Sequence, residues 1–339
     1  MNVTIVRLGG IGDGVLALST AAAVRKAWPG SRITMLCGER AAPLFEHHPD
    51  VERTQVASGD EPTRELVALF RDAVDAAVFL MPYRRLMWAA FRARVPLRVA
   101  TGYRWHSVLA NRRVYQHRKH FTKHEAEYNL DLLRGLGIEP GPLIPPTLIV
   151  TDAERQDGAA RMSAMPAACI AIHPGGVTSR RWSSRRYWDL ALRMASRGIG
   201  VVLTGSAEEQ AVLRQEVPEA HEHGHGVLNL MGQLTVRQLM GVLAGVRAVV
   251  SGSTGPAHIA AALGIPTVSL YDPRRLSAPI RWRPLGTGVV LQPAVPECPK
   301  CIFDACPYWD CLDRLTVDHV GEQLIDVMRA PKPLTVVSI

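Results

Sequence analysis

The first part of the chain alternates short apolar runs with segments whose apolar residues recur at helical spacing. The apolar runs are 2–8, 32–37 and 76–81, and the helical segments are 16–27, 63–71 and 125–136. Short runs rich in Val, Ile and Leu predict buried strands. Because strands that alternate with helices form βαβ units with a parallel sheet, we predict an α/β domain here.

The same alternation starts again after a segment that interrupts it. Residues 135–146 contain three Gly and four Pro and cannot continue a helix, so we interpret them as a linker. Beyond it, strands are predicted at 169–175, 200–205, 247–252, 266–271 and 288–292, and helices at 184–196, 208–216, 236–244, 256–263 and 317–328. We therefore expect two domains, 1–147 and 148–339, with the last helix in a position to pack back on the N-terminal domain.

A glycine-rich turn joins the first strand to the first helix. Such a turn presents backbone N–H groups to a phosphate in dinucleotide-binding folds, yet this one carries Asp13, whose carboxylate repels a phosphate. One role for Asp13 is that of a general base that accepts a proton from a hydroxyl nucleophile. The other is to cap a helix that begins near Gly14. The residues alone leave both roles open.

A second turn of small residues follows the strand predicted at 247–252. Pro256 suits the first turn of the next helix, where a missing N–H costs nothing. No acidic residue lies near in the sequence, and the helix start leaves N–H groups and the positive end of the helix dipole facing outward. The residues predicted to hold a phosphate are Ser253, Thr254, Gly255 and Pro256. His258, one turn into the helix, either lines this site or is a core histidine.

A basic segment lies just past another strand. Residues 173–188 read HPGGVTSRRWSSRRYW, and open α/β sheets bind their ligands at the carboxyl ends of strands. A diphosphate held between this segment and the second turn would be neutralised by an arginine and by helix N–H groups. The candidate donor-binding residues of the segment are Thr178, Ser179, Arg180 and Arg181. The alternative is a Gly–Pro turn beside a surface cluster of ion pairs.

The charge of the chain is unevenly distributed. The net charge is +8, and from Ala76 to His124 there are eleven basic residues and no acidic one. Such a stretch favours an anionic partner, which would be a phosphorylated glycolipid, a membrane surface or a nucleic acid; the alternative is a solvated arginine-rich face. No apolar run is long enough to span a bilayer, and Arg7 and Asp13 interrupt any signal-peptide core, so we expect a cytoplasmic protein.

Four of the six cysteines are crowded into one short segment. These are Cys298, Cys301, Cys306 and Cys311, in the sequence CPKCIFDACPYWDC. Four thiolates could hold a structural zinc ion, although common zinc motifs separate two close pairs by a longer loop. Free or redox-labile thiols are the alternative, and disulfides do not suit a cytosolic chain.

Four motifs in this order resemble glycosyltransferase family 9, the heptosyltransferases of lipopolysaccharide core assembly, over nearly the whole chain. The motifs are RLGGIGDGVLALSTAAAVRKAWPGSRITML at 7–36, KHEAEYNLDLLRGLGI at 123–138, IHPGGVTSRRWSSRRYWDLA at 172–191 and SGSTGPAHIAAALGIPTVSLY at 251–271. The cysteine segment followed by LTVDHV also resembles the branch that adds the second heptose.

The resemblance implies a GT-B fold, in which two Rossmann-like domains with parallel sheets face each other across a cleft. The N-terminal domain would bind the acceptor and the C-terminal domain the nucleotide sugar. It also implies an inverting transfer that needs no metal or other cofactor, from ADP-heptose to a hydroxyl of a lipid-linked lipopolysaccharide acceptor. The enzyme would then be a peripheral one at the inner face of the inner membrane, docked there by its basic N-terminal domain.

The family pattern also assigns roles to individual residues. Asp13 falls on the general base, and Arg180 on the basic residue that steadies the donor diphosphate. Gly12, Lys123, His124 and Glu125 fall on the acceptor side. The chain departs from the pattern at two positions, because the family usually has Lys where Arg180 stands and often has Asp where Ser253 stands. The second departure bears on the identity of the donor sugar.

Three other functions are alternatives to this one. Within the family, the enzyme could use another nucleotide sugar or another glycan acceptor. An NAD(P)-dependent oxidoreductase is disfavoured because the first turn lacks G-x-G-x-x-G in register. A non-enzymatic nucleotide- or nucleic-acid-binding protein would use the aromatic residues among the arginines, but it leaves both glycine turns unused, so we expect no nucleic-acid partner. The aromatic residues are Tyr83, Trp88, Phe91, Tyr103 and Trp105.

Overall fold

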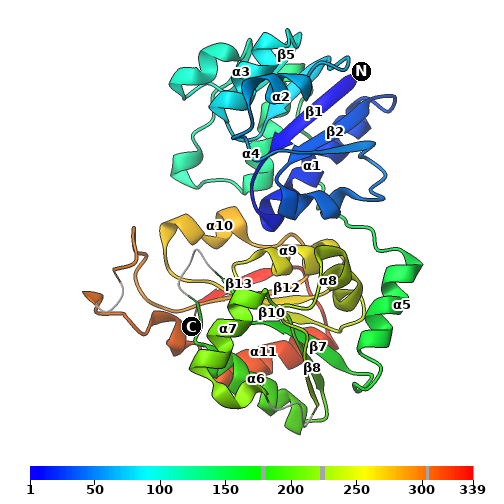
Figure 1. Ribbon diagram of the computed structural model, residues 1–339. Helices are drawn as coiled ribbons and strands as arrows, with labels where there is room; N and C mark the ends of the chain where they lie inside the picture. The colour runs from blue at the N-terminus through cyan, green and yellow to red at the C-terminus, as the bar shows by residue number, and fades with distance from the viewer. Residues whose placement is uncertain (177–180, 222–225, 303–304, 339) are drawn as a thin grey trace. The chain divides into compact units, whose positions relative to one another are not determined.

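The chain folds into two compact units, Met1–Ile149 and Val150–Ile339, each built on its own sheet (Figure 1). The structure is a computed structural model that describes residues 1–176, 181–221, 226–302 and 305–338. Residues 138–151, at the junction, form neither helix nor strand, as the prolines of this region dictate. The division lies two residues beyond position 147, where the sequence pattern places it.

Unit 1 contains a six-stranded sheet in the order β3-β2-β1-β4-β5-β6, and its strand pairings are all parallel. The strands are β1 (Asn2–Arg7), β2 (Arg32–Cys37), β3 (Arg53–Val56), β4 (Ala76–Phe79), β5 (Leu97–Thr101) and β6 (Arg112–Val114). The α-helices are α1 (Ile11–Ala27), α2 (Thr63–Ala68), α3 (Arg84–Arg92) and α4 (Glu125–Asp131). Helix α1 packs with α4, and α2 packs with α3.

Unit 2 contains a seven-stranded sheet in the order β13-β12-β11-β10-β7-β8-β9, again with parallel pairings between its strands. The strands are β7 (Cys169–His173), β8 (Gly200–Leu203), β9 (Val227–Asn229), β10 (Val249–Gly252), β11 (Thr267–Leu270), β12 (Gly288–Gln292) and β13 (Thr335–Ser338). The α-helices are α5 (Asp152–Arg161), α6 (Ser184–Ser196), α7 (Ala207–Glu216), α8 (Val236–Leu243), α9 (Gly255–Ala262), α10 (Pro279–Trp282) and α11 (Val317–Arg329).

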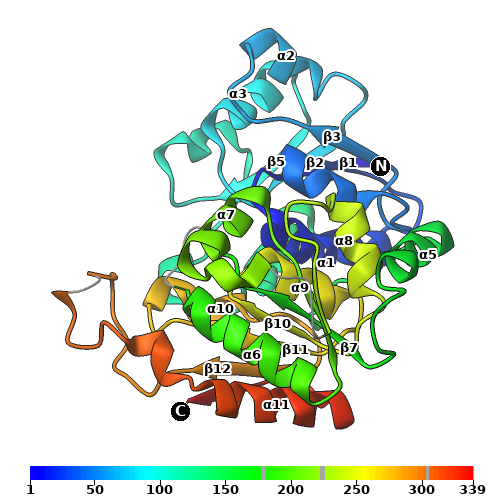
Figure 2. The same ribbon diagram turned by 60° about the horizontal axis from the view of Figure 1, so that its bottom comes forward.

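Helices cover both faces of the second sheet. Helix α6 packs with α11, and α8 packs with α9; Figure 2 shows the two pairs on opposite sides of the strands. Trp182 and Tyr187 are fully buried in the core of this unit, and Trp182 Nε1 donates to the carbonyl oxygen of Leu315 at 2.9 Å. Val320 and Leu324 of α11 lie in the same core, so this helix packs on the sheet of unit 2.

The elements that the sequence pattern misses are short, polar or at the edge of a sheet. The strands without a prediction are β3, β5, β6, β9 and β13, and the helices are α3, α5 and α10. Strands β3 and β6 lie at the edges of the first sheet, and their sequences RTQV and RRV carry arginines in place of an apolar run. Helix α5 has the polar sequence DAERQDGAAR, and Gly158 is its one buried residue.

Two predicted helices also differ from the observed ones. Helix α1 begins at Ile11, five residues before position 16, because Gly12 and Gly14 are helical here rather than part of the turn. A Cβ atom on Gly14 would lie 2.9 Å from the Cβ of Ala41, so this glycine permits close packing. The helix predicted over 125–136 is α4 followed by a 3₁₀ segment, Leu132–Leu136, that ends at Gly137 in the left-handed conformation. In the described part of the chain, no helix is long and apolar enough to cross a membrane.

Helices α5 and α8 approach each other through two glycines. A Cβ atom on Gly158 would lie 2.4 Å from the carbonyl oxygen of Gly241, and one on Gly241 would lie 2.3 Å from that of Glu154. Beside this contact, Arg237 Nε donates to Glu154 Oε1 at 2.6 Å. Partial burial tends to raise the pKa of Glu154, but the hydrogen bonds from Arg237 and Thr151 lower it to about 2. The first helix of unit 2 is therefore fixed to its own unit at neutral pH.

Replacing Gly241 with Ala should destabilise unit 2, because the added methyl group meets backbone atoms that can move only with a helix. We expect a loss of about 1–3 kcal/mol, the cost of overpacking, measured by urea unfolding. Gly30→Ala is the control, because nothing lies within 4 Å of a Cβ atom there. Equal stability of the two variants would contradict the proposed close approach.

Candidate functional site

Both sheets reverse their strand order next to a turn that the sequence singles out. In unit 1 the reversal is between β1 and β4, and in unit 2 it is between β7 and β10. Open α/β sheets bind ligands outside the carboxyl ends of strands at this switch point. The first glycine turn follows β1, whereas the basic segment follows β7 and the second turn follows β10. Both glycine turns therefore lie at the switch point of their own sheet.

Asp13 lies at the third position of α1, directly after the turn. Its Oδ2 accepts a hydrogen bond from the Gly10 N–H at 3.1 Å, and its Oδ1 accepts one from Arg7 Nη2. The side chain is 24% exposed, so it is held on both oxygens and still open to solvent. A capping hydrogen bond is thus present, but it is made from inside a helix that begins at Ile11 rather than near Gly14.

The glycine at position 9 leaves room for this carboxylate. A Cβ atom on Gly9 would lie 2.2 Å from Asp13 Oδ2. A larger residue would therefore push the aspartate out of its position. The turn therefore leaves space for a fixed carboxylate. This explains why it contains glycine although the carboxylate would repel a phosphate.

Arg7 connects Asp13 to a buried chain of charges. It occupies the last position of β1 and is 5% exposed, and its Nη2 lies 3.8 Å from Glu125 Oε1. Glu125, at the start of α4, is 1% exposed and also accepts from Arg118 Nη1 at 2.6 Å. Burial tends to lower the pKa of Arg7, but Asp13 and Glu125 raise it above its ordinary value. Arg7 therefore stays cationic and fixes the orientation of Asp13.

The acceptor-side residues of the sequence prediction have different surroundings. Gly12 lies in the first turn of α1. Lys123 is half-exposed, and its Nζ donates to Asp131 Oδ2 at 2.8 Å. His124 is buried, and its Nδ1 accepts from the Ala126 N–H at 3.2 Å, so it caps the start of α4. Of Gly12, Lys123 and His124, it is therefore Lys123 that has an exposed polar side chain.

The second glycine turn opens α9 at the switch point of unit 2. Thr254 precedes the helix, Gly255 begins it, and Pro256 lies in its first turn. The Thr254 side chain does not cap the helix and instead lies 2.7 Å from Ser251 Oγ. The positive end of the α9 dipole is therefore available to an anion.

The residues of this turn are partly buried, whereas the residues that follow them in α9 are buried. Ser253, Thr254 and Gly255 are half-buried and Pro256 is buried. His258 is 5% exposed, inside a helix whose following residues are all buried.

The turn after β7 lies beside the second glycine turn, because His173 is in register with Ser251. Glu209 of α7 holds this turn: its Oε1 accepts from the Gly176 N–H at 3.0 Å, and a Cβ atom on Gly175 would lie 2.0 Å from it. Burial lowers the pKa of His173, although Glu209 acts to raise it, so the imidazole is neutral at neutral pH.

Of the four candidate donor-binding residues in the basic segment, Arg181 falls in the described part of the chain. Thr178, Ser179 and Arg180 lie outside the described residues. Arg181 Nη2 forms an ion pair with Glu216 Oε1 at 2.5 Å, which is the surface ion pair that the sequence offered as the alternative role.

Two residues of these sites, Arg7 and Glu209, were missed in the sequence. Arg7 had a visible signal, since it is a charge at the end of an apolar strand. Glu209 had one in the capping box that it forms with Ser206. Glu125 is predicted on the acceptor side, but its burial has no signal in the sequence because its partner Arg7 is distant along the chain.

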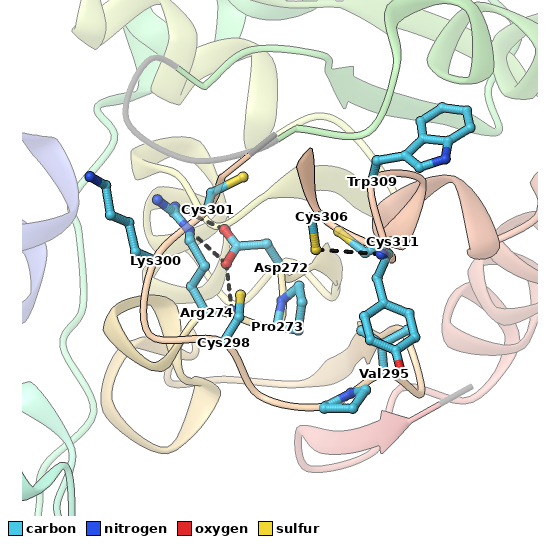
Figure 3. A pocket seen from close by; sticks show the side chains of 12 residues that line it. Asp272, Pro273, Arg274, Val295, Cys298, Lys300, Cys301, Cys306, Trp309 and Cys311 are labelled. Atoms are coloured by element: carbon cyan, nitrogen blue, oxygen red, sulfur yellow. Dashed lines mark hydrogen bonds and ion pairs between the residues drawn. The ribbon is translucent and has the colours of Figure 1, made fainter. Parts of the chain in front are cut away.

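The four clustered cysteines line a pocket with Asp272 and Arg274 (Figure 3). Within the described residues, none of the four forms a disulfide. Figure 3 shows Cys298 and Cys301 beside the Asp272–Arg274 ion pair, with Cys306 and Cys311 together on another side. Burial and the Asp272 charge raise the pKa of Cys298. Among residues 1–176, 181–221, 226–302 and 305–338, no three His, Cys, Asp or Glu side chains are arranged to hold a metal, so the structural zinc stays a prediction.

The buried charge chain generates a stability prediction. Glu125→Ala should cost about 3–5 kcal/mol in the free energy of unfolding, because it leaves Arg7 and Arg118 without their shared buried partner. Glu139→Ala is the matched control: its ion pair with Arg134 has the carboxylate 79% exposed, so its loss should cost about 1 kcal/mol or less. Urea unfolding of both variants measures the difference. Similar costs would show that the chain of charges does not support unit 1.

Known proteins resemble this chain both in sequence and in fold. "Lipooligosaccharide heptosyltransferase 2" of Haemophilus influenzae is 24% identical over 301 residues, 80% of this chain and 84% of that protein. "Lipopolysaccharide heptosyltransferase 2" of Escherichia coli is 29% identical over 161 residues, 43% of each chain.

Solved structures share the fold over almost the whole length. A glycosyl transferase family 9 protein of Veillonella parvula superposes with a TM-score of 0.82 at 19% identity, over 97% of each chain. ADP-heptose lps heptosyltransferase II of E. coli superposes with a TM-score of 0.80 at 23% identity, over 97% of this chain and 99% of that one. An E. coli heptosyltransferase solved with ADP gives a TM-score of 0.70 at 21% identity, over 97% of this chain and 100% of that one.

These likenesses confirm the predicted GT-B fold of two Rossmann-like domains. The family profile described as "Glycosyltransferase family 9 (heptosyltransferase)" matches residues 72–307, which includes the second glycine turn and the basic segment. The chain is therefore a glycosyltransferase, and it belongs to glycosyltransferase family 9.

Proposed function

We propose that this protein transfers a heptose from ADP-heptose to a hydroxyl of a lipopolysaccharide core acceptor, with inversion at the anomeric carbon and without a metal ion. The observation that carries the proposal is the opposite charge of the two switch points. The unit 1 turn holds a fixed, partly exposed carboxylate, and the unit 2 turn presents an uncapped helix N-terminus. Unit 1 would bind the acceptor, and unit 2 the donor.

In this proposal Asp13 is the general base. It would accept the proton of the acceptor hydroxyl as the oxygen attacks the anomeric carbon and the bond to the diphosphate breaks on the opposite face. Arg7 pairs with one oxygen of the carboxylate and orients it, and the Gly10 N–H holds the other oxygen. The aspartate therefore meets the acceptor with no change of its own position.

The departing diphosphate would be stabilised in unit 2. Thr254, Gly255 and Pro256 surround the start of α9, whose N–H groups and dipole attract negative charge. Ser253 and the segment from Thr178 to Arg181 complete the proposed donor site, with Arg180 as the cation that neutralises the leaving group. These charges do the work that a divalent cation does in metal-dependent transferases, so chelator should leave the activity unchanged.

The sugar and the acceptor are the finer parts of the proposal. Relatives named as lipopolysaccharide or lipooligosaccharide heptosyltransferases, and an E. coli heptosyltransferase solved with ADP-2-deoxy-2-fluoro heptose, support ADP-heptose and a core acceptor. Ser253 is a neutral hydroxyl where many family members have a carboxylate, which favours testing other nucleotide sugars as well. Thermal shift with a panel of nucleotide sugars, and with ADP and UDP as controls, identifies the donor.

Asp13→Ala and Asp13→Asn should each lower kcat by about 10²- to 10⁴-fold, the contribution of a positioned base. Binding of ADP should be unchanged, because the donor is held in unit 2. Single-turnover sugar transfer and ADP titration measure the two quantities. Asp72→Asn is the control, since this carboxylate is 77% exposed and outside the turn. A fully active Asp13→Asn enzyme excludes the proposed base.

Arg180→Ala should weaken ADP binding by about ten- to a hundredfold, because a hydrogen bond to a charged group is worth about 1.5–3 kcal/mol. Arg180→Lys restores the cation that the family usually carries and should keep most of the affinity. Arg185→Ala, which removes a nearby arginine paired with Glu219, is the matched control. Titration calorimetry with ADP compares the variants. An Arg180→Ala protein that binds ADP as the parent does would remove Arg180 from the donor site.

A lipid-linked acceptor also implies where in the cell the enzyme acts. We propose that the enzyme acts as a peripheral protein at the inner face of the inner membrane, where such an acceptor is embedded. The eleven basic residues between Ala76 and His124 support this, because the acceptor and the membrane lipids carry negative charge.

A further inference from the structure

Helix α3 presents an aromatic face to solvent. Its residues Leu86, Met87, Ala89 and Ala90 are buried in the core of unit 1. On the other side Trp88 is 42% exposed and Phe91 is 44% exposed, and their rings stack with centroids 5.6 Å apart. Burying one side of the helix would have been enough to fold it. The second apolar face is therefore unexplained by the core of unit 1.

A neighbouring 3₁₀ helix, Trp105–Leu109, carries a second exposed apolar pair. Trp105 is 77% exposed and Val108 is 67% exposed. Because a 3₁₀ helix has three residues per turn, these two side chains project from the same face. The segment packs against α3, and His106 Nε2 lies 2.8 Å from the carbonyl oxygen of Pro82, just before α3 begins. The two exposed pairs thus lie on elements that pack against each other.

Positive charge surrounds these side chains without acidic partners. Arg84 and Arg92 lie on α3 at the spacing that places them on the face of Trp88, and the Arg92 guanidinium is 6.0 Å from the Trp88 ring centroid. Arg104 directly precedes Trp105. Among the described residues, none of these three arginines pairs with a carboxylate, whereas Arg85 lies 3.5 Å from Asp60, where α2 packs on α3.

The combination fits a lipid surface better than a nucleic acid. A nucleobase needs a free ring face to stack on, but Trp88 stacks on Phe91, and the Arg98 guanidinium lies 5.4 Å from the Phe91 ring centroid. An exposed aliphatic side chain such as Val108 offers nothing to a phosphate backbone. Tryptophan, phenylalanine and valine flanked by arginine are what the interface of an anionic bilayer accommodates.

We propose that Arg84, Trp88, Phe91, Arg92, Trp105 and Val108 form a membrane-docking surface on unit 1, whose apolar side chains enter the headgroup region of a bilayer rich in anionic phospholipids. The arginines would pair with lipid phosphates while the aromatic rings and Val108 lie at the depth of the glycerol groups. This surface deepens the proposed function and rests on it only for its purpose, which is to bring unit 1 to an embedded acceptor.

The test is co-sedimentation of the full chain with vesicles, without any sugar donor or acceptor. The protein should bind vesicles of phosphatidylglycerol and phosphatidylcholine, should bind phosphatidylcholine alone weakly, and should dissociate as salt rises. The double variant Trp105→Ala/Val108→Ala should bind about tenfold more weakly, because apolar area is lost from the interface. Trp309→Ala is the matched control, a tryptophan 56% exposed in unit 2, and should bind as the parent does.

A second variant separates charge from apolar insertion and guards against misfolding. Arg84→Gln/Arg92→Gln should weaken binding to the anionic vesicles and reduce its salt dependence, and circular dichroism should show both double variants folded. Unchanged vesicle binding in both variants overturns the proposal. So does tighter binding of the parent to single-stranded RNA than to the vesicles, with the same loss in the double variant.

Transfer to a water-soluble acceptor keeps this proposal distinct from the reaction. There the Trp105→Ala/Val108→Ala protein should be as active as the parent, because the docking surface does not touch the proposed base. If transfer fails for all proteins while vesicle binding follows the pattern above, the reaction is wrong and the docking surface stands.

Discussion

The ion pair between Arg7 and Asp13 is the interaction on which the rest of unit 1 depends. A guanidinium buried at the end of a central strand is tolerated only because Asp13 and Glu125 lie against it. The pair fixes the glycine turn, the start of α1 and, through Glu125 and Arg118, the segment before α4. A carboxylate that would otherwise rotate freely is thereby held toward solvent in a single position.

In unit 2 the carboxylate of Glu209 fixes the turn after β7, next to the neutral imidazole of His173. Glu209 accepts backbone N–H groups from Gly176 and from Ser206, so it joins the turn after β7 to the start of α7. The adjacent turn before α9 has no such carboxylate within the part of the chain that the structure describes. The Glu209 carboxylate thus holds the turn after β7. The N-terminus of α9 has no side-chain cap.

Much of the fold could be predicted from the sequence because its central strands are continuous apolar runs. β1, β7, β10 and β11 are buried on both faces, and a doubly covered parallel strand shows this in its residues. The edge strands β3, β6 and β13 and helix α5 could not be found in this way, since most of their side chains are at least partly exposed.

Of the candidate sites, Asp13 and the second turn follow from local sequence, because each stands directly after a predictable strand. The buried partners do not. Glu125 is expected on the acceptor side from the family motif, but its buried contacts with Arg7 and Arg118 are visible only in the structure. His124 shows the reverse, since a residue expected on the acceptor side is a buried helix cap.

The arginines of β3 and β6 have a consequence for association. An exposed edge of a sheet offers unpaired N–H and C=O groups on which another chain can build a strand. Here both outer strands of the first sheet are short and carry charge, at Arg53 on one side and at Arg112 and Arg113 on the other. Self-complementary strand addition would bring these like charges together, so unit 1 is protected from aggregation at both of its borders.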